Sequence, residues 1–365
     1  MQNDSLKYLV ALTRFPKIGP IRFKNLINFF NSTKRIWNAN FSELKQAGLE
    51  EDIITEFLEK RKEINPDAEM EQMIKYGIGA IAIEDENYPK NLCEIYDPPF
   101  ILYYKGNIKC LNGFNVAVVG SRKPTVYGRQ AADLIAGGLA QNGIAIVSGM
   151  AFGIDTISHE ATVKNNGQTI GVLGSGIDEK SFYPKQNLRL MDEIIDKNGI
   201  IISEYPIGSP SLPQNFPHRN RIISGISLGV IVVEAAEKSG SLITAKFALD
   251  QNKEIFAVPG SIFSDLSAGP NNLIKMGAKP VSSAKDILDA LSLNQAADFK
   301  ESRNIIPDTA EEKIILEHLT HNPLHIDELK RLTNLDIKTL SGVLTMMEMK
   351  GKTRNLGGMN YVRGN

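Results

Sequence analysis

A glycine, a serine and an arginine follow directly after an apolar run of the chain. Residues 116–119 read Val-Ala-Val-Val, which is typical of a buried strand, and Gly120, Ser121 and Arg122 come next. Where a strand passes through a glycine turn into a helix, the first amide N–H groups of the helix lack partners and bind anions. The arginine adds a planar cation that can donate two hydrogen bonds to a phosphate. This junction is therefore a candidate phosphate site.

The fingerprints of mononucleotide and dinucleotide sites are absent from this junction. No G-x-G-x-x-G follows Val119, and no acidic residue stands about 20 residues further on to hold a ribose. Gly174-Ser175-Gly176 comes nearest, but Glu179 stands where a third glycine is expected, and no G-x-x-x-x-G-K-[ST] occurs. We therefore expect neither NAD nor ATP, and no other cofactor.

An aromatic residue with two arginines close behind it forms a second candidate site. Phe216, Arg219 and Arg221 lie within residues 205–233, a stretch that contains no acidic residue. A ring can stack on any base while cations neutralise phosphates, which is the combination that single-stranded nucleic acid requires. The stretch therefore predicts binding of single strands without sequence preference.

Two acidic residues give the same stretch an alternative, structural interpretation. If the arginines paired with Glu204 or Glu234 and Phe216 filled the core, the stretch would stabilise the fold instead of binding DNA. The two glutamates also resemble a catalytic carboxylate pair, but no nucleophile accompanies them. No catalytic residue is therefore assigned.

Two further loops offer small residues and free amides after predicted strands. The first is residues 239–244, which includes Gly240 and Ser241, and the second is residues 269–272, which includes Asn271. Loops that follow parallel strands meet at one edge of the sheet, where ligands bind. Four such loops at one edge favour several successive phosphates over a single one.

The histidines do not form a convincing metal or acid–base site. Asp155 precedes His159 by one helical turn, which favours a capping aspartate and a hydrogen-bonded helix histidine over a ligand pair. Three more histidines lack acidic or cysteine partners at metal-binding spacing, and we expect them at the surface: His318, His321 and His325. The sequence thus predicts no metal site.

The composition is that of an ordinary soluble protein of two or three domains. The chain has 365 residues, of which 42% are hydrophobic, and a formal net charge of −1. Its two cysteines, Cys93 and Cys110, are too few for a disulfide framework. No secretory leader and no apolar run of membrane-spanning length is visible, so we expect a cytoplasmic protein without membrane contact.

The region from 76 to 292 alternates short apolar runs with helix-length segments. Six runs rich in β-branched residues predict strands that are buried on both faces: 116–119, 144–147, 170–173, 200–202, 230–233 and 255–258. Intervening segments predict helices: 128–142, 155–165 and 241–251. The repeated βαβ pattern predicts an α/β fold with a doubly wound parallel sheet.

The region from 1 to 75 has helical periodicity and carries a run of cations. Seven basic residues lie between Lys7 and Arg35, and no acidic residue occurs between Asp4 and Glu43. The stretch from Phe15 to Pro20 resembles the turn of a helix-hairpin-helix, in which amides and cations meet a phosphodiester. The alternative is a solvated helical face, and the sequence leaves both open.

The end of the chain predicts a linker followed by a small separate domain. Residues 293–311 are polar, poor in apolar side chains and contain Pro307. Residues 312–365 show three short helical patterns and then a glycine-rich stretch that predicts a hairpin. Three helices and a hairpin suggest a winged-helix domain, which could bind duplex DNA or protein.

These residues resemble those of the DprA/Smf family of bacterial DNA-processing proteins along nearly the whole chain. The blocks that carry the resemblance are Tyr88-Pro89 through Asp97-Pro98-Pro99, Gly120-Ser121-Arg122, 148–155 with His159, Tyr183-Pro184, 216–225, 239–242, 257–260, and Asn271 with Leu273-Ile274. The resemblance implies an extended Rossmann-like domain that binds single-stranded DNA without hydrolysing it. It also implies homodimers formed through this domain, protection of incoming strands in natural transformation, and loading of the RecA recombinase.

The resemblance also assigns roles to individual residues. Arg122 and the amides of Gly120 and Ser121 would hold phosphate, and Phe216 would stack on bases. The full implied DNA-binding set is Gly120, Ser121, Arg122, Lys185, Phe216, Arg219, Asn220, Arg221, Gly240, Ser241 and Asn271. Pro270 departs from the family pattern, which usually has threonine there, and this puts the role of the last loop in doubt.

Two other functions stay open on the sequence. Nucleotide phosphoribohydrolases share a related fold but carry a P-G-G-x-G-T run, and residues 234–244 lack these glycines. A transcription regulator that uses only the winged helix would prefer duplex DNA to single strands.

Overall fold

The computed structural model describes residues 3–293, 308–319, 324–350, 352–355 and 357–363. These residues fall into two compact units, 1–291 and 292–365. Most of the predicted linker, residues 294–307, lies outside the described residues, as does His321.

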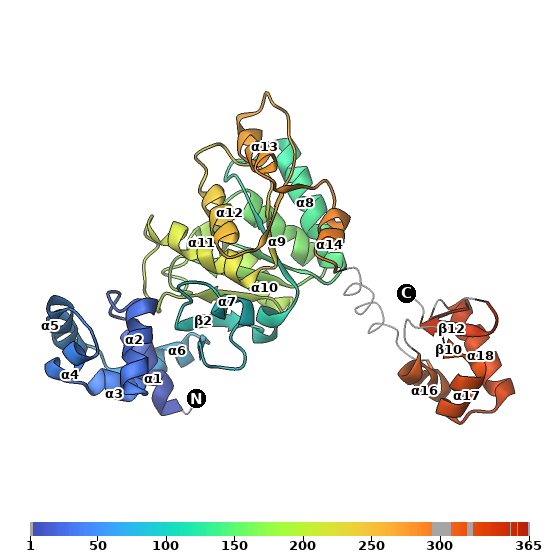
Figure 1. Cartoon of the computed structure of the whole chain (residues 1–365), viewed down its shortest axis with the longest axis horizontal. Helices are drawn as coiled ribbons and strands as arrows, with labels where there is room; N and C mark the ends of the chain where they lie inside the picture. The colour runs from blue at the N-terminus through green and yellow to red at the C-terminus, as the bar shows by residue number, and fades with distance from the viewer. Residues whose placement is uncertain (1–2, 294–307, 320–323, 351, 356, 364–365) are drawn as a thin grey trace. The chain divides into compact units, whose positions relative to one another are not determined.

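A nine-stranded sheet forms the centre of the first unit (Figure 1). Its strands follow in chain order: β1 (Gly79–Ala82), β2 (Ile101–Gly106), β3 (Asn115–Val119), β4 (Ala145–Ser148), β5 (Thr169–Leu173), β6 (Ile200–Ser203), β7 (Gly229–Val232), β8 (Glu254–Ala257) and β9 (Lys279–Pro280). In space the order is β1-β2-β6-β5-β4-β3-β7-β8-β9. In this spatial order, all neighbouring strands from β6 to β9 pair in parallel. The pairs β1–β2 and β2–β6 are antiparallel. The predicted α/β fold and its six strands are confirmed.

Three strands were not predicted, because their sequences lack a continuous β-branched run. Strand β2 contains two tyrosines and ends in glycine, strand β1 has a single β-branched residue, Ile81, and β9 has two residues. They extend the parallel sheet at its two edges, where strands are less buried. The antiparallel β1–β2 pair joins the sheet to the N-terminal helices.

Helices cover both faces of the sheet. They are α7 (Lys90–Cys93), α8 (Val126–Gln141), α9 (Ile154–Lys164), α10 (Leu188–Asp196), α11 (Asn215–Ile226), α12 (Gly240–Asp250), α13 (Ala268–Lys275) and α14 (Ala284–Ala290). Ile222 of α11 and Ala245 of α12 lie in one hydrophobic core with Ala117 of β3. Helix α10 packs Ile194 against Ile201 of β6 within a second core. Because α11 and α12 follow β6 and β7, their first turns lie at the carboxyl edge of the parallel strands.

The N-terminal helical region shares this second core. Its helices are α1 (Asn3–Leu12), α2 (Pro20–Phe30), α3 (Thr33–Asn38), α4 (Phe41–Gln46), α5 (Glu51–Lys60) and α6 (Pro66–Lys75). The ring of Phe23 stacks on that of Phe100 with centroids 4.2 Å apart, and the hydroxyls of Thr13 and Tyr103 lie 2.7 Å apart. The helices before β1 are therefore packed onto the sheet as part of one unit.

The described residues of the second unit form three helices and a three-stranded sheet. The helices are α16 (Ala310–His318), α17 (Ile326–Thr333) and α18 (Ile337–Met349), and the strand order is β10 (Leu324–His325), β12 (Asn360–Arg363), β11 (Thr353–Asn355). Leu316, Leu329 and Leu344 meet in its core. The predicted winged-helix architecture is confirmed, with β10 as an additional short strand. His325 lies at the surface, where its Nδ1 accepts the amide of Asp327 at 3.3 Å and caps α17.

The described residues contain neither a membrane-spanning helix nor a cluster of candidate metal ligands. No helix in this part of the chain has both the length and the hydropathy needed to span a membrane. Within the same residues, no group of three histidine, cysteine, aspartate or glutamate side chains is placed to hold a metal ion.

Candidate nucleic-acid interface

A groove of about 760 Å³ opens at the edge of the sheet where β3 and β7 end. Three segments form its walls: the turn after β3, the first turns of α11, and the start of α12. Eight of the predicted site residues line it: Gly120, Ser121, Arg122, Phe216, Arg219, Asn220, Gly240 and Ser241. The groove thus lies where ligands bind in open parallel sheets, beyond the carboxyl ends of the strands.

Arg122 provides the accessible positive charge of the groove. Its side chain is exposed, and its guanidinium carbon lies 5.6 Å from the centre of the Phe216 ring. None of the ion pairs found among the described residues involves Arg122. An arginine over an aromatic face is held by a cation–π interaction, which keeps its hydrogen-bond donors free. Arg122 can therefore bind an anion at the mouth of the groove.

The amide of Ser121, one of the two amides predicted to hold phosphate, is already engaged within the protein. The N–H of Ser121 donates to the carbonyl of Glu234 at 2.7 Å, and the N–H of Lys123 donates to Oγ of Ser121 at 3.1 Å. The turn is tight, because a Cβ on Gly120 would lie 2.7 Å from Cγ1 of Ile154. Gly120 and Ser121 therefore shape the turn, and Arg122 presents the charge.

The N-terminus of the next helix already holds an anion from the protein itself. The carboxylate of Glu234 accepts the amide of Thr125 at 2.8 Å and its hydroxyl at 2.5 Å, directly before α8. Gly128 is required there, because a Cβ at this position would collide with the Glu234 carboxylate. The phosphate site expected at this helix end is thus occupied by Glu234. This corrects the sequence-based mechanism while leaving Arg122 in the groove.

Three aromatic rings form a continuous cluster, of which Phe216 and Tyr183 line the groove and Phe152 adjoins Tyr183. The ring centroids of Phe216 and Tyr183 lie 5.9 Å apart, and those of Tyr183 and Phe152 lie 6.5 Å apart. Tyr183 is 44% exposed and Phe152 is 38% exposed, while Phe216 is half-buried. Phe216 therefore keeps part of its surface open instead of filling the core. The stacking role was predicted for Phe216 alone, because only the fold brings the segments after β4 and β5 beside α11.

Arg219 forms part of the floor of the groove. Its side chain is 3% exposed, and Nη1 donates to the carbonyl of Gly149 at 2.8 Å and to that of Val172. Burial lowers the pKa of Arg219 to about 10, an effect that the nearby carboxylate of Asp155 opposes. A Cβ on Gly149 would lie 2.5 Å from the Arg219 guanidinium. Arg219 therefore holds the loop after β4 in place.

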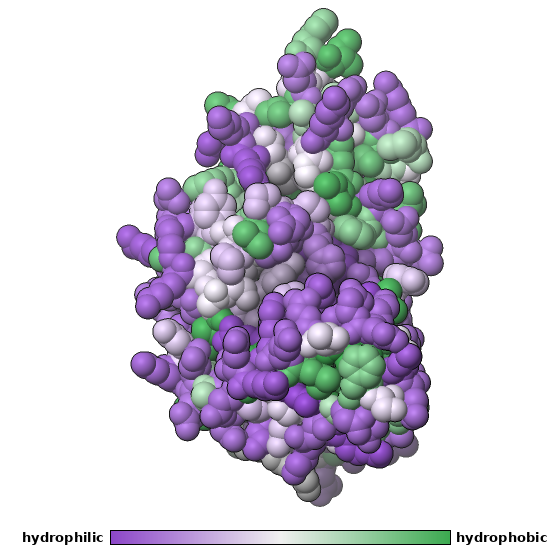
Figure 2. Space-filling model, turned by 90° about the vertical axis from the view of Figure 1, so that its left-hand side faces the viewer, coloured by the Kyte–Doolittle hydropathy of each residue, from purple (hydrophilic) through white to green (hydrophobic). Residues whose placement is uncertain are grey.

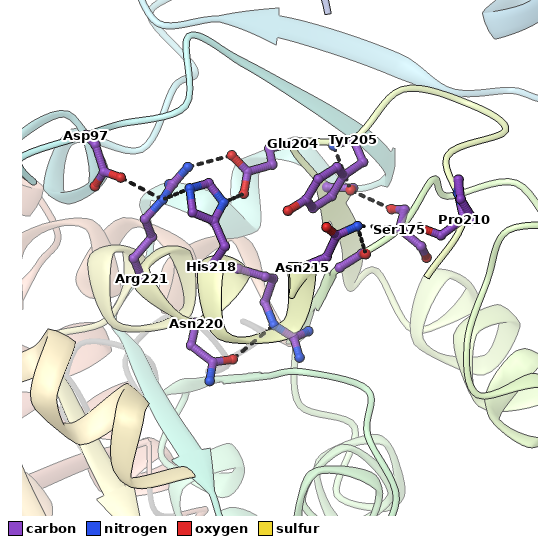
Figure 3. A network of polar contacts seen from close by, with 12 residues as sticks. Asp97, Ser175, Glu204, Tyr205, Pro210, Asn215, His218, Asn220 and Arg221 are labelled. Carbon is purple, nitrogen blue, oxygen red and sulfur yellow. Dashed lines mark hydrogen bonds and ion pairs between the residues drawn. The ribbon is translucent and has the colours of Figure 1, made fainter. Parts of the chain in front are cut away.

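Arg221 lies outside the groove, which corrects its predicted place in the DNA-binding set. It is 1% exposed, Nη2 donates to the carboxylate of Glu204 at 2.5 Å, and Nε lies 3.1 Å from the carboxylate of Asp97 (Figure 3). The same glutamate pairs with His218, whose Nδ1 is 3.1 Å away. Residues two apart on a helix face different sides, so Arg219 and Arg221 cannot both reach one groove. The structural alternative, pairing with Glu204, is correct for Arg221.

Asp155 and His159 are structural residues, as the sequence favoured. A carboxylate oxygen of Asp155 accepts the amides of Gly149 at 3.1 Å and Ala151 at 3.4 Å. His159 is fully buried, and its Nδ1 lies 2.7 Å from the hydroxyl of Thr169. Burial lowers the pKa of His159 to about 3, so the ring is neutral at ordinary pH.

Of the remaining predicted residues, Ser241 lines the groove, whereas Asn271 and Lys185 do not. Ser241 lies in the groove wall, with its hydroxyl 2.8 Å from that of Ser239 at the start of α12. Asn271 lies away from the groove, because its amide side chain closes the loop before α13 through two hydrogen bonds to the backbone of Gly260. Lys185 lines a neighbouring hollow, and its ammonium donates to the carbonyl of Lys180 at 3.1 Å.

Known protein families match both the sheet domain and the winged helix of this chain. A family model described as DNA recombination-mediator protein A matches residues 79–292, and one described as the DprA winged helix domain matches residues 300–359. Protein Smf of Synechocystis sp. is 32% identical over 100% of both chains. DNA processing protein DprA of Bacillus subtilis is 47% identical over 59% of this chain and 72% of its own.

Solved structures show the same fold. DNA processing protein A of Streptococcus pneumoniae is 36% identical, with a TM-score of 0.68, covering 78% of this chain and 97% of its own. DNA processing protein A of Helicobacter pylori is 32% identical, with a TM-score of 0.53, covering 60% of this chain and 96% of its own. The latter is described as having a single-stranded DNA binding mode.

The fold and the matches together define a class: DNA-processing proteins that combine a mostly parallel α/β sheet domain with a winged helix. Within this class, the chain belongs to the DprA/Smf family.

Proposed function

We propose that this chain binds single-stranded DNA in the groove at the carboxyl edge of its sheet, without recognising the sequence. The observation that carries the proposal is the exposed Arg122 guanidinium over the half-buried ring of Phe216. The charge would neutralise a phosphate while the ring stacks on a base. The description of the Helicobacter pylori relative as a single-strand binder supports it.

The geometry favours a single strand over a duplex. Phe216, Tyr183 and Phe152 can each offer a ring face or edge only to a base whose own faces are open. Bases in a duplex are stacked on their neighbours and would have to be separated at a cost in free energy. The groove therefore selects unpaired strands by stacking, not by hydrogen bonds to base edges.

We extend the proposal to a role in recombination, on the strength of the family. The bound strand would be protected and handed to the RecA recombinase in the cytoplasm, by a homodimer formed through the sheet domain. The family description as a recombination-mediator protein supports this role. Binding alone accounts for it, so we propose no catalytic step; incubation with nucleoside monophosphates and assay for free base tests the hydrolase alternative.

The experiment that tests the proposal compares oligo-dT with a matching duplex for the wild type and Phe216→Ala. We expect the wild type to prefer the single strand. Loss of the ring should weaken single-strand binding by about tenfold or more, because one base–aromatic stack contributes about 1–3 kcal/mol. Fluorescence anisotropy measures both affinities. A wild type that prefers duplex would contradict the proposal.

Tyr127→Ala is the matched control for loss of an exposed ring. Tyr127 is 48% exposed on α8 and does not line the groove. Its removal should leave single-strand affinity within about twofold of the wild type, since it offers no stack to the bound strand. Equal losses in the two variants would also overturn the proposal.

A further inference from the structure

A second hollow adjoins the groove and is built partly by the N-terminal helical region. It has a volume of about 750 Å³, and it shares Tyr183 and Ser211 with the groove. One wall comes from the segment after β5, including Lys180 and Lys185, and the other from the end of α6, with Lys75 and Tyr76. Figure 2 shows the molecule from the side on which the helical region lies. The surface is hollowed next to this region. A strand leaving the groove past Tyr183 would enter this hollow.

The charge of the hollow is mostly uncompensated. Lys75, Lys180 and Lys185 have exposed side chains, and none of them takes part in an ion pair within the described ranges. The acidic residue of the lining is Asp178, whose carboxylate accepts the amide of Gly208 at 2.7 Å and the amide and hydroxyl of Ser181. Three lysines thus face one hydrogen-bonded carboxylate, and an anionic ligand is favoured.

Three other cations of the helical region are neutralised by contrast. Arg14 also reaches this hollow but is bound to Glu69, and Lys17 in the turn from 15 to 20 pairs with Glu56. Arg22 pairs with Glu50 at 2.8 Å. Within the helical region, the end of α6 is therefore a better phosphate contact than the hairpin-like turn.

Aromatic rings accompany these lysines. Tyr183 stands at the junction with the groove, and Tyr76, 40% exposed, lies on the helical wall of the hollow. Lysines with interspersed exposed rings are the lining that sequence-independent single-strand binding uses. A folded protein partner would need a larger apolar contact than these two rings supply.

We propose that the DNA strand continues from the groove over Tyr183 into this hollow, where Lys75 and Tyr76 of the helical region bind it. The inference rests on the proposed function and extends it: the helical region is part of the DNA-binding surface. The ligand at this second site is a further stretch of the same single strand. Phosphates would meet the lysines, and a base would stack on Tyr76.

The test compares a short strand of about 6 nucleotides with a long one of about 20, since the two hollows together exceed what a short strand covers. A long strand offers more overlapping positions to one binding site than a short strand does. In the wild type we expect the long strand to bind more tightly than this larger number of positions explains. Lys75→Glu and Tyr76→Ala should each weaken the long strand about fivefold to tenfold and leave the short strand within about twofold, since the groove alone holds it. Both residues are exposed, and thermal unfolding verifies that each variant is folded.

Lys24→Glu is the matched control, because Lys24 is an exposed lysine of α2 that does not line the hollow. It should leave both strands unaffected. Equal losses with Lys24→Glu and Lys75→Glu, or no length-dependent loss in either α6 variant, would overturn the inference. Failure of the proposed function itself gives a different result: Phe216→Ala would then leave even the short strand unaffected.

Discussion

Two turns of this chain combine glycine with basic residues, and they have opposite fates in the fold. In the turn from 15 to 20, Phe15 and Ile18 are buried, and Lys17 is bound to Glu56 of α5. In the turn after β3, Arg122 is exposed, lies over an aromatic ring and takes no part in the ion pairs of the described residues. The first turn holds the helices together, and the second presents charge to a groove.

The difference shows that a cation run in the sequence does not by itself mark a DNA-binding surface. The acidic residues that neutralise the first turn lie about 30 to 40 positions further along the chain, beyond any local window. What distinguishes a binding cation is the lack of such a partner together with an adjacent ring. The predictions below test this distinction between bound and free cations.

The largest effect is expected where a bound cation is buried. Arg221→Ala should lower the free energy of unfolding by about 3–5 kcal/mol, because it leaves the carboxylates of Glu204 and Asp97 without their partner. Urea unfolding measures the loss. Arg189→Ala, which removes an arginine whose side chain is 91% exposed, is the control and should have little effect. A stable Arg221→Ala that has lost DNA affinity would reverse our assignment.

A smaller effect is expected from a change of pH, because the sheet domain contains a buried histidine and the helical region contains none. His159 is buried below the groove, its folded pKa of about 3 lies below the usual 6.5, and residues 1–75 contain no histidine. The unfolded state binds the proton first, so stability is lost as the pH falls from 6.5 toward 3, by up to about 1.4 kcal/mol per pH unit. Urea unfolding at pH 6.5 and 5 should show this decline, and His159→Gln should flatten it. An unchanged slope in that variant would contradict the assignment.

The smallest effect is expected for a bound cation at the surface. Lys17→Gln should change single-strand affinity by less than about twofold, because its charge is already neutralised by Glu56. Anisotropy with a long oligo-dT measures it. A loss as large as that of a groove variant would show that the turn from 15 to 20 binds DNA after all.

Most of the fold could be predicted because buried segments have recognisable local patterns of apolar residues. The β-branched runs identify the six central strands, and Pro20 begins α2 at the predicted break between helices. Strands β1 and β2 were not predicted, because neither contains a continuous run of β-branched residues. The winged helix was recognisable from three apolar periodicities and a glycine-rich hairpin.

The site was predictable in part. The sequence placed Arg122, Phe216 and Ser241 at one edge of the sheet, and all three line the groove there, because parallel strands bring their carboxyl ends to one edge. Arg221 lies outside the groove because residues two apart on a helix lie on different sides of it. A motif written as a linear sequence does not show this. The occupation of the α8 N-terminus by Glu234 depends on a contact between residues more than 100 positions apart, and no local pattern reveals it.

We propose that Arg122 is a free cation that neutralises a phosphate of a bound single strand. The direct measurement is oligo-dT affinity across a salt series for the wild type, Arg122→Gln, and Arg129→Gln as an exposed arginine outside the groove. Loss of one phosphate contact should weaken binding and reduce the slope of log affinity against log salt by about 0.7. We expect this change for Arg122→Gln and not for Arg129→Gln. An unchanged slope and affinity in Arg122→Gln would contradict the proposal.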